Sequence, residues 1–149
     1  MNQHPVLYVE DEENDVLFLR NAWKKAGLLN PLHIVTDGEQ AVGYLSGRGA
    51  FANRHEHPMP ALVLLDLKLP KLSGLDVLKW IREERSIHTL PVIVFSSSNN
   101  PQDVCRAYEL RANAYLVKPA NVQGLIELVA SLKDFWLGRV EISPAFAEL

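Results

Sequence analysis

The sequence lacks several features that would mark particular classes of protein. Its one cysteine, Cys105, excludes an intrachain disulfide and a cysteine-based zinc cluster, and suits a reducing compartment. The longest apolar stretches, such as residues 61–65, fall far short of the ~20 residues that a membrane helix requires. The formal net charge is −3, so a broad basic surface for nucleic acid is not expected. Because the first residues also lack the pattern of a signal peptide, we expect a cytoplasmic protein that binds neither nucleic acid nor membrane.

What the sequence does contain is a regular alternation of two kinds of segment. Its 149 residues, 48 % of them hydrophobic and 22 % charged, suit one globular domain. Segments with helical periodicity follow short apolar runs, and the last of them spans residues 122–137. Runs that are apolar on both faces predict a parallel sheet covered on both sides. The fold expected is a doubly wound α/β sandwich of five strands in the flavodoxin-like order 2-1-3-4-5. The apolar runs span residues 6–9, 32–35, 61–65, 92–95 and 114–117.

Two stretches do not fit this alternation. Residues 47–60 are rich in Gly, His, Arg and Pro and predict an inserted, extended surface loop. Residues 141–149 predict a C-terminal tail without regular structure, which leaves residues 1–140 as the domain.

Charged and hydroxyl side chains follow the predicted strands at the ends where parallel sheets place their ligands. Glu10 and Asp11 follow the first strand, Asp66 the third, Ser96 the fourth and Lys118 the fifth. Three crowded carboxylates must either raise a pKa or bind a cation, and a partly open set of hard oxygen ligands suits Mg²⁺. A lysine and a hydroxyl beside them suit a phosphoryl group, so the set predicts phosphoryl transfer to Asp66 as the nucleophile.

Four motifs at these strand ends together resemble a response-regulator receiver domain: residues 9–11, residues 64–70 with Gly74, residues 96–97 and residues 118–119. The resemblance covers roughly the whole chain and implies an Mg²⁺-dependent phosphoacceptor that a histidine kinase phosphorylates. It also implies that the bond between Lys118 and Pro119 is cis.

The resemblance implies a role for each of these residues. The phosphoacceptor would be Asp66. Mg²⁺ would be bound by Asp11, Asp66 and the backbone carbonyl of Lys68, with Glu10 acting through water. Ser96 and Lys118 would bind the phosphoryl group, and Ser96 and Tyr115 would form the conformational switch. Lys68 and Ser98, two residues beyond Asp66 and Ser96, are poorly suited to orient a water molecule, which predicts slow self-dephosphorylation.

A narrower resemblance is to the single-domain response regulators of bacterial phytochrome kinases. It rests on the loop 47–60, on Pro70-Lys71, on residues 96–100 and on the ending 134–137. It implies a homodimer through the face formed by the fourth helix, the fifth strand and the fifth helix. The candidate residues of that face are Leu125, Leu128, Leu132, Phe135 and Trp136. The alternative is that Phe135 and Trp136 fold back onto their own core.

The function expected is that of a stand-alone signalling protein, not an enzyme, whose phosphorylation changes its interaction surface for an unknown downstream protein. One alternative is an Mg²⁺-dependent phosphatase, although Lys68 stands where a haloacid-dehalogenase-type enzyme has its second acid. Another is a receiver that binds partners without phosphorylation. A flavin carrier would need a phosphate loop where residues 10–13 are acidic.

Several of these residues also have ordinary structural interpretations. The acids of residues 10–15 suit the start of any helix, and Lys118 suits a solvated strand end. Tyr115 could be a packing residue, and the strand register could place Ser97 where Ser96 is expected. His55 and His57 lie in a loop and lack the spacing of a helical metal site.

Overall fold

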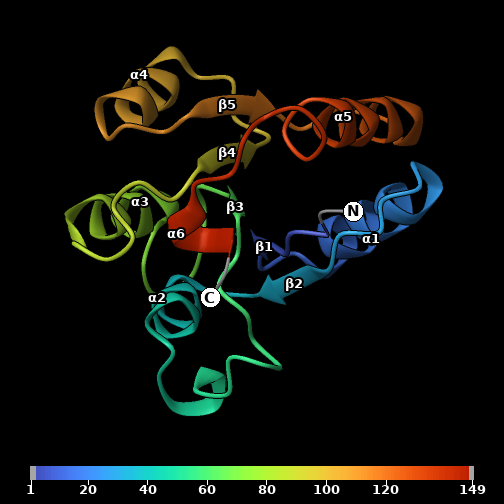
Figure 1. Ribbon diagram of the computed structural model, residues 1–149. Coiled ribbons are helices and arrows are strands. Elements are labelled where there is room, and N and C mark those ends of the chain that lie inside the picture. Colours follow the sequence, from blue (N-terminus) through green and yellow to red (C-terminus); the bar gives the residue numbers. More distant parts are fainter. Residues whose placement is uncertain (1–2, 148–149) are drawn as a thin grey trace.

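The computed structural model describes residues 3–147 and contains one parallel five-stranded sheet in the order β2-β1-β3-β4-β5 (Figure 1). In register, Val6 of β1 pairs with Leu32 of β2 and with Leu62 of β3, and Ile93 of β4 pairs with Ala114 of β5. This architecture confirms the predicted fold class and strand order. The strands are β1 (Val6–Val9), β2 (Leu32–Val35), β3 (Leu62–Leu65), β4 (Val92–Ser96) and β5 (Ala114–Val117).

Helices cover both faces of the sheet (Figure 1). They are α1 (Glu13–Lys25), α2 (Gly38–Ser46), α3 (Gly74–Glu83), α4 (Pro101–Glu109), α5 (Val122–Asp134) and the short α6 (Pro144–Ala147). Helices α1 and α5 lie side by side on one face, while α2, α3 and α4 cover the other. Within residues 3–147, none of the helices combines the length and the hydropathy that a bilayer crossing requires.

The central strands are apolar on both faces because each face has its own core. In β1, Leu7 and Val9 pack toward α2 and α3, while Val6 and Tyr8 pack toward α1 and α5. All four are at most 1 % exposed. The alternation along a fully buried strand explains the unbroken apolar run in the sequence.

The start of α3 lies directly against the end of β3. Ser73 caps the helix in a capping box with Asp76, and Gly74 follows. A Cβ atom on Gly74 would lie 2.0 Å from the carbonyl oxygen of Asp66, so glycine is required for this close approach. The contact fixes the backbone of Asp66 at the edge of the sheet.

The C-terminal segment corrects two expectations. Helix α5 ends at Asp134, earlier than predicted, because the chain turns there and Trp136 and Leu137 pack on the α1–α5 core. Residues 141–149 were predicted to lack regular structure, yet α6 forms and Phe146 is only 3 % exposed in the core under α2 and α3. Residues 148–149 of that tail lie outside the described residues.

The inserted loop 47–60 lies at the surface, but it is compact instead of extended. It contains a 3₁₀ turn at Gly49–Phe51. The guanidinium of Arg54 donates hydrogen bonds to the carbonyl oxygens of Tyr44 (2.6 Å), Leu45 (2.9 Å) and His57 (3.1 Å). The loop therefore closes onto the C-terminal end of α2.

Candidate functional site

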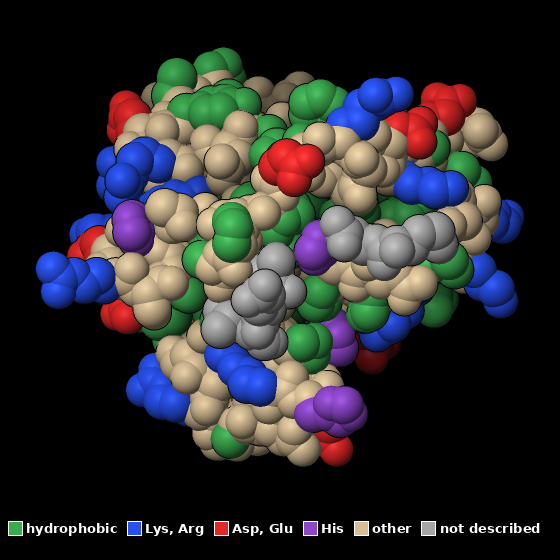
Figure 2. All heavy atoms as spheres, viewed as in Figure 1, with side chains coloured by type: hydrophobic (Ala, Val, Ile, Leu, Met, Phe, Trp, Pro, Cys, Tyr) green, Lys and Arg blue, Asp and Glu red, His purple; other side chains and the backbone are tan. Residues whose placement is uncertain are grey.

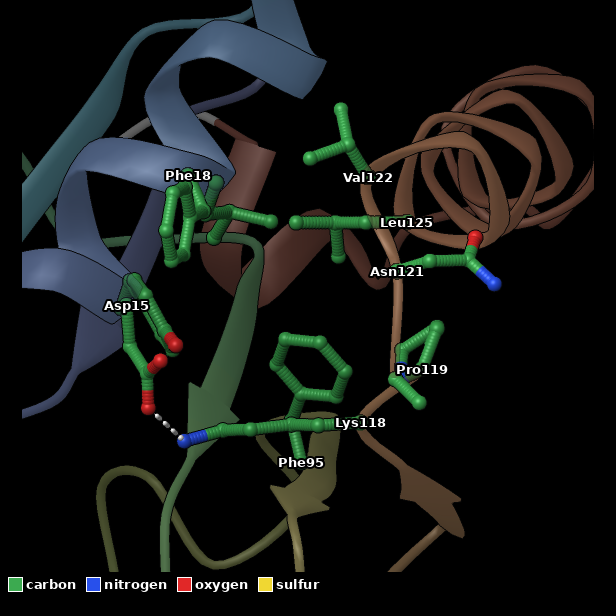
Figure 3. Close-up of a pocket in the computed structure, with 11 residues that line it drawn as sticks. Asp15, Phe18, Phe95, Lys118, Pro119, Asn121, Val122 and Leu125 are labelled. Atoms are coloured by element: carbon green, nitrogen blue, oxygen red, sulfur yellow. Dashed lines mark hydrogen bonds and ion pairs between the residues drawn. The ribbon is translucent and has the colours of Figure 1, made fainter.

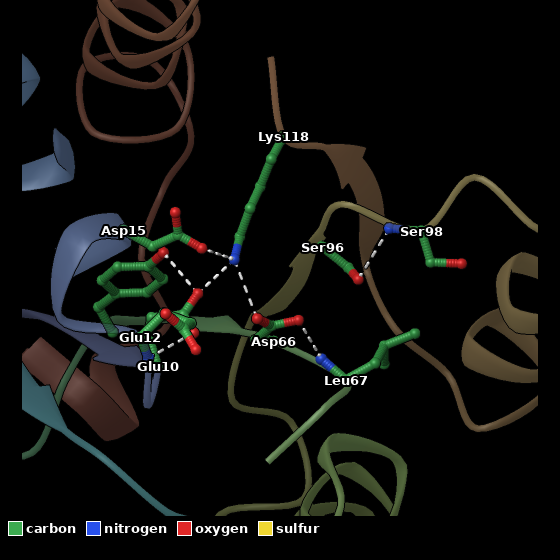
Figure 4. A network of polar contacts seen from close by, with 9 residues as sticks. Glu10, Glu12, Asp15, Asp66, Leu67, Ser96, Ser98 and Lys118 are labelled. Carbon is green, nitrogen blue, oxygen red and sulfur yellow. Dashed lines mark hydrogen bonds and ion pairs between the residues drawn. The ribbon is translucent and has the colours of Figure 1, made fainter. Parts of the chain in front are cut away.

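Side chains from four strand ends and from α1 meet at the carboxyl edge of the sheet (Figure 4). Glu10 follows β1, Asp66 follows β3, Ser96 ends β4 and Lys118 follows β5. Because β1, β3 and β4 are neighbours in the sheet, residues far apart in the sequence lie within hydrogen-bond reach. The structure brings Glu10, Asp66 and Lys118 together, as the sequence predicted.

The ammonium group of Lys118 is the centre of this cluster. Its Nζ lies 2.9 Å from Oδ2 of Asp66, 2.9 Å from Oδ2 of Asp15, and in contact with Oε1 of Glu10 (Figure 4). An ammonium has three N–H donors, so these three carboxylates account for all of them. Burial acts to lower the pKa of Lys118, but the hydrogen bonds to Glu10, Asp66 and Asp15 outweigh it and raise the pKa. Lys118 is therefore charged.

Asp15 is the member of the cluster that sequence reasoning missed. It lies in the first turn of α1 and was attributed to an ordinary acidic helix start. The signal available in the sequence was its place in the first turn of the helix that directly follows Glu10 and Asp11. Its side chain is 37 % exposed, in contrast to the fully buried Glu10.

Glu10 is completely buried, and its oxygens are occupied by groups of the protein. Tyr8 Oη donates to Oε1 over 3.1 Å, and the backbone N–H of Glu12 donates to Oε2 over 3.2 Å. Burial raises the pKa of Glu10 to about 7, and the nearby Asp66 also raises it, while Lys118 acts in the opposite direction. In this structure Glu10 is therefore held by Tyr8, Lys118 and the backbone of Glu12, and its metal contact through water stays a prediction.

Asp66 is 7 % exposed, and both of its carboxylate oxygens have partners. Oδ1 accepts a hydrogen bond from the backbone N–H of Leu67 over 2.7 Å, and Oδ2 accepts one from Lys118. The carboxylate is therefore oriented at a fixed place on the edge of the sheet, with a cation beside it.

The remaining predicted metal ligands lie at the rim of the site. Asp11 and Lys68 are exposed, at the ends of β1 and β3 respectively. Among residues 3–147, no three His, Cys, Asp or Glu side chains are grouped closely enough to hold a metal ion by themselves. The carboxylates of Asp11 and Asp66 and the carbonyl of Lys68, which follow the ends of β1 and β3, would supply a small set of hard oxygen donors. Such a set fits a divalent cation that keeps several water ligands.

The predicted switch residues are joined through the loop that follows β4. Ser96 is 1 % exposed, and its Oγ accepts a hydrogen bond from the backbone N–H of Ser98 over 3.2 Å. Tyr115 is partly buried, and its Oη donates to the carbonyl oxygen of Ser98 over 2.8 Å. Every peptide bond among residues 3–147 is trans, so the cis bond expected between Lys118 and Pro119 is not found.

A cavity of about 270 Å³ adjoins the cluster between α1 and the start of α5 (Figure 3). Asp15 and Lys118 form its polar wall, while Phe18, Val122 and Leu125 form its apolar wall. Phe18 and Val122 are 48 % and 55 % exposed, so apolar surface lies next to the charged site.

The five residues predicted to form a dimer face differ in exposure. Leu132 is 4 % exposed and belongs to the protein's own core, so its prediction as a surface contact is wrong. Leu125, Leu128 and Trp136 are partly buried against that core, whereas Phe135 is 57 % exposed. Other exposed apolar side chains lie over α4 and β5 (Figure 2), where Tyr108 and Val117 are 49 % and 43 % exposed.

Comparison with known proteins agrees with this geometry. Residues 6–130 match the model of the response regulator receiver domain. Response regulator Rcp1 of Synechocystis sp. is 36 % identical over 140 residues, which cover 94 % of this chain and 93 % of Rcp1. A crystal structure of the Mn²⁺-bound form of Rcp1 superposes with a TM-score of 0.83, at 34 % identity, and covers 93 % of this chain and 98 % of that one.

Two further solved structures are similar over nearly their whole length. The phosphorylated cyanobacterial phytochrome response regulator RcpA has a TM-score of 0.86 and 33 % identity, covering 94 % of this chain and 98 % of its own. Response regulator RPA3017, from red light signaling of R. palustris, has a TM-score of 0.87 and 38 % identity, covering 93 % of this chain and 97 % of its own. The chain therefore belongs to the response regulator receiver domain family and is a phosphoacceptor response regulator.

Proposed function

We propose that Asp66 accepts a phosphoryl group from a histidine kinase of the phytochrome type, with Mg²⁺ as the metal. The observation that carries this proposal is the contact of 2.9 Å between Oδ2 of Asp66 and the ammonium of Lys118, at the carboxyl edge of a parallel sheet. A carboxylate held beside a cation is placed both to attack phosphorus and to have the new charge offset.

In the proposed step, one carboxylate oxygen of Asp66 attacks the phosphorus of a phosphohistidine. A P–O bond forms while the P–N bond breaks, and the imidazole nitrogen leaves with the electron pair. Lys118 then shifts its contact from the free carboxylate to a phosphoryl oxygen. The hydroxyl of Ser96 turns toward a second phosphoryl oxygen. Mg²⁺, held by Asp11, Asp66 and the carbonyl of Lys68, would offset the remaining charge.

The choice of kinase rests on the relatives. RcpA is a phytochrome response regulator and RPA3017 acts in red light signaling, and each matches this chain over more than nine-tenths of its length. We extend the proposal to a phytochrome kinase as the donor and to the cytoplasm as the location, which the exposed thiol of Cys105 also fits. The output is a changed protein surface, not a product released by an enzyme.

For the output, we propose that phosphorylation acts through Ser96 and Tyr115 on the surface of α4, β5 and α5. Exposed apolar side chains on α4 (Tyr108), on β5 (Val117) and directly after α5 (Phe135) support a protein contact there, which we propose to be a homodimer. The downstream protein would read the same surface.

The test of the proposal is phosphorylation by acetyl phosphate, followed by intact mass. We expect wild type to gain ~80 Da only when Mg²⁺ is present, and Asp66→Asn to gain nothing, because an amide cannot form the acyl phosphate. Asp134→Asn, a change of an exposed aspartate at the end of α5, is the matched control and should behave as wild type. Equal gains in wild type and Asp66→Asn would exclude Asp66 as the acceptor. No gain in either protein would favour a receiver that only binds partners, or a hydrolase.

The lifetime of the phosphorylated state gives a second test. Lys68 carries an ammonium, which donates but cannot accept a proton from water, and the hydroxyl of Ser98 is engaged with Asp103, so neither group is suited to activate an attacking water. We expect slow decay in wild type and several-fold faster decay in Lys68→Asn, measured by loss of the added mass over time. An unchanged decay rate in the variant would contradict this expectation.

A further inference from the structure

Ser98 lies in the loop between β4 and α4, and its N–H, its carbonyl and its hydroxyl each form a hydrogen bond with a different residue of the predicted switch or of α4. The N–H of Ser98 donates to Oγ of Ser96 over 3.2 Å (Figure 4). The carbonyl oxygen of Ser98 accepts from Oη of Tyr115 over 2.8 Å. Its hydroxyl donates to Oδ2 of Asp103 in α4 over 2.6 Å. Ser98 therefore contacts the predicted phosphoryl ligand, the predicted aromatic switch and the next helix at once.

The bond to Asp103 forms an unusual start for α4. In a common capping box, the acidic side chain at the third helical position bonds directly to the backbone N–H of the N-cap residue. Here the N-cap is Asn100, and its N–H donates to Oγ of Ser98 over 3.2 Å, while that same oxygen donates its proton to Asp103. The hydroxyl of Ser98 thus bridges the two partners that a capping box joins directly. The start of α4 depends on a residue of the loop outside the helix.

We propose that Ser98 is a latch, a positioning residue that holds the start of α4 in its resting place until Ser96 moves. This inference rests on the proposed function, because the trigger is the phosphoryl group on Asp66. When the hydroxyl of Ser96 turns to that group, the N–H of Ser98 loses its acceptor. The loop then shifts, and the bond from the hydroxyl of Ser98 to Asp103 is released.

The bond to Asp103 is strong enough to matter for such a switch. A short hydrogen bond to a charged carboxylate changes an equilibrium by roughly tenfold or more. Asp103 also lies in the first turn of α4, so this bond joins the loop directly to the start of the helix. Loss of this bond therefore moves the balance between resting and released α4 without any change at Asp66.

The native Cys105 allows a direct test, because it is exposed on α4 and is the one cysteine of the sequence. The full chain is labelled there with a trifluoromethyl group, and its ¹⁹F signal is recorded before and after phosphorylation with acetyl phosphate and Mg²⁺. Intact mass measures the phosphorylated fraction in the same samples. We expect the wild-type signal to move on phosphorylation.

Variants of Ser98 and Asp103 show whether Ser98 acts as a latch or only supports the fold of the loop. In Ser98→Ala and in Asp103→Ala, we expect the signal of the unphosphorylated protein to lie already toward the wild-type phosphorylated position. The further change on phosphorylation, taken per phosphorylated molecule from the intact mass, then shrinks. The double variant should go no further than either single one, because both remove the same bond. Ser98→Thr keeps the hydroxyl and should restore the wild-type signal, and Ser97→Ala, in the same loop, is the exposed matched control.

The outcomes that overturn the latch differ from those that overturn the proposed function. A Ser98→Ala signal equal to that of wild type in both states would contradict the latch, as would phosphorylated wild type whose signal does not move. Absence of the added mass in wild type would instead remove the proposed function on which the latch depends.

Discussion

Lys118 and Arg54 each hold three acceptor oxygens, yet the two regions are built for different purposes. Lys118 contacts three carboxylates, those of Glu10, Asp15 and Asp66. Arg54 contacts three neutral backbone carbonyls and closes the loop 47–60 onto α2. Carboxylates can take up protons, bind a metal or become phosphorylated, whereas the carbonyls can do none of these things with comparable ease. Lys118 is therefore a cation whose partners can change, whereas Arg54 is a cation that holds a loop in place.

The largest difference between variants of Lys118 and of Arg54 should appear in the rate of phosphorylation. In the proposed mechanism Lys118 offsets the phosphoryl charge, so we expect Lys118→Ala to lower the rate of phosphorylation by acetyl phosphate by about 100-fold. Arg54→Ala should leave that rate within about twofold of wild type, because Arg54 contacts no group of the site. Stopped time points analysed by intact mass give both rates. A comparable loss of phosphorylation rate in both variants would mean that Arg54 also supports the chemistry at Asp66.

The next difference is in the pH dependence of stability. Burial raises the pKa of Glu10 to about 7 in the folded protein, so folding favours its protonated form. The contribution of Glu10 to the free energy of unfolding therefore falls as pH rises from about 4.5 to about 7, by an amount on the order of 3 kcal/mol. Glu10→Gln cannot titrate, so the difference in unfolding free energy between wild type and variant should follow this curve.

The measurement is urea denaturation of both proteins at several pH values with EDTA present, so that no divalent ion replaces the proton. The difference isolates Glu10 from other groups, such as His33, whose pKa is lowered mainly by burial and which therefore also titrates with folding. A difference that is constant between pH 4.5 and 7 would show that Glu10 has no raised pKa.

The contribution of Arg54 to stability should, in contrast, not depend on pH. Arg54→Ala leaves three partly buried carbonyl oxygens without their donor, which we expect to lower the free energy of unfolding by about 2 kcal/mol. Because the acceptors carry no charge, that loss should be the same at pH 5 and pH 7. Denaturation of wild type and variant at the two pH values tests it. A loss that changes with pH would mean that an ionisable group also depends on Arg54.

The smallest effect expected is that of Asp15. Its side chain is 37 % exposed, and exposed ion pairs contribute little, so Asp15→Asn should change the free energy of unfolding by less than about 1 kcal/mol. The variant also releases one of three carboxylates that compete for Lys118, and a modestly faster phosphorylation should follow. A strong loss of stability, seen by thermal or urea unfolding, would place Asp15 with Glu10 as a structural member of the cluster.

Much of the fold follows from local patterns. The apolar runs of β1 and β3 are buried on both faces, and such runs can be recognised without knowledge of their partners. The convergence of Glu10, Asp66 and Lys118 follows in turn from the strand order, because parallel strands end at one edge. These features are correct because each depends on a repeating pattern or on topology.

The features that sequence reasoning missed depend on tertiary contacts instead. Phe146 lies in a segment with no periodicity, and only the core that it enters gives it a structured helix. The role of Arg54 depends on carbonyl groups, which every residue carries and which leave no signature in a sequence. The burial of Glu10 has no signature in the sequence either, because it depends on contacts with Tyr8 and with Lys118, which lies far away along the chain.

The central claim is that the phosphoryl group resides on Asp66, and mapping the modified residue tests it most directly. The full chain is phosphorylated with acetyl phosphate and Mg²⁺, reduced with borohydride, which converts an aspartyl phosphate to homoserine, and analysed by peptide mass spectrometry. We expect homoserine at position 66 and at no other aspartate. Homoserine at Asp11 or Asp15, or none in a chain that has gained the added mass, would contradict it.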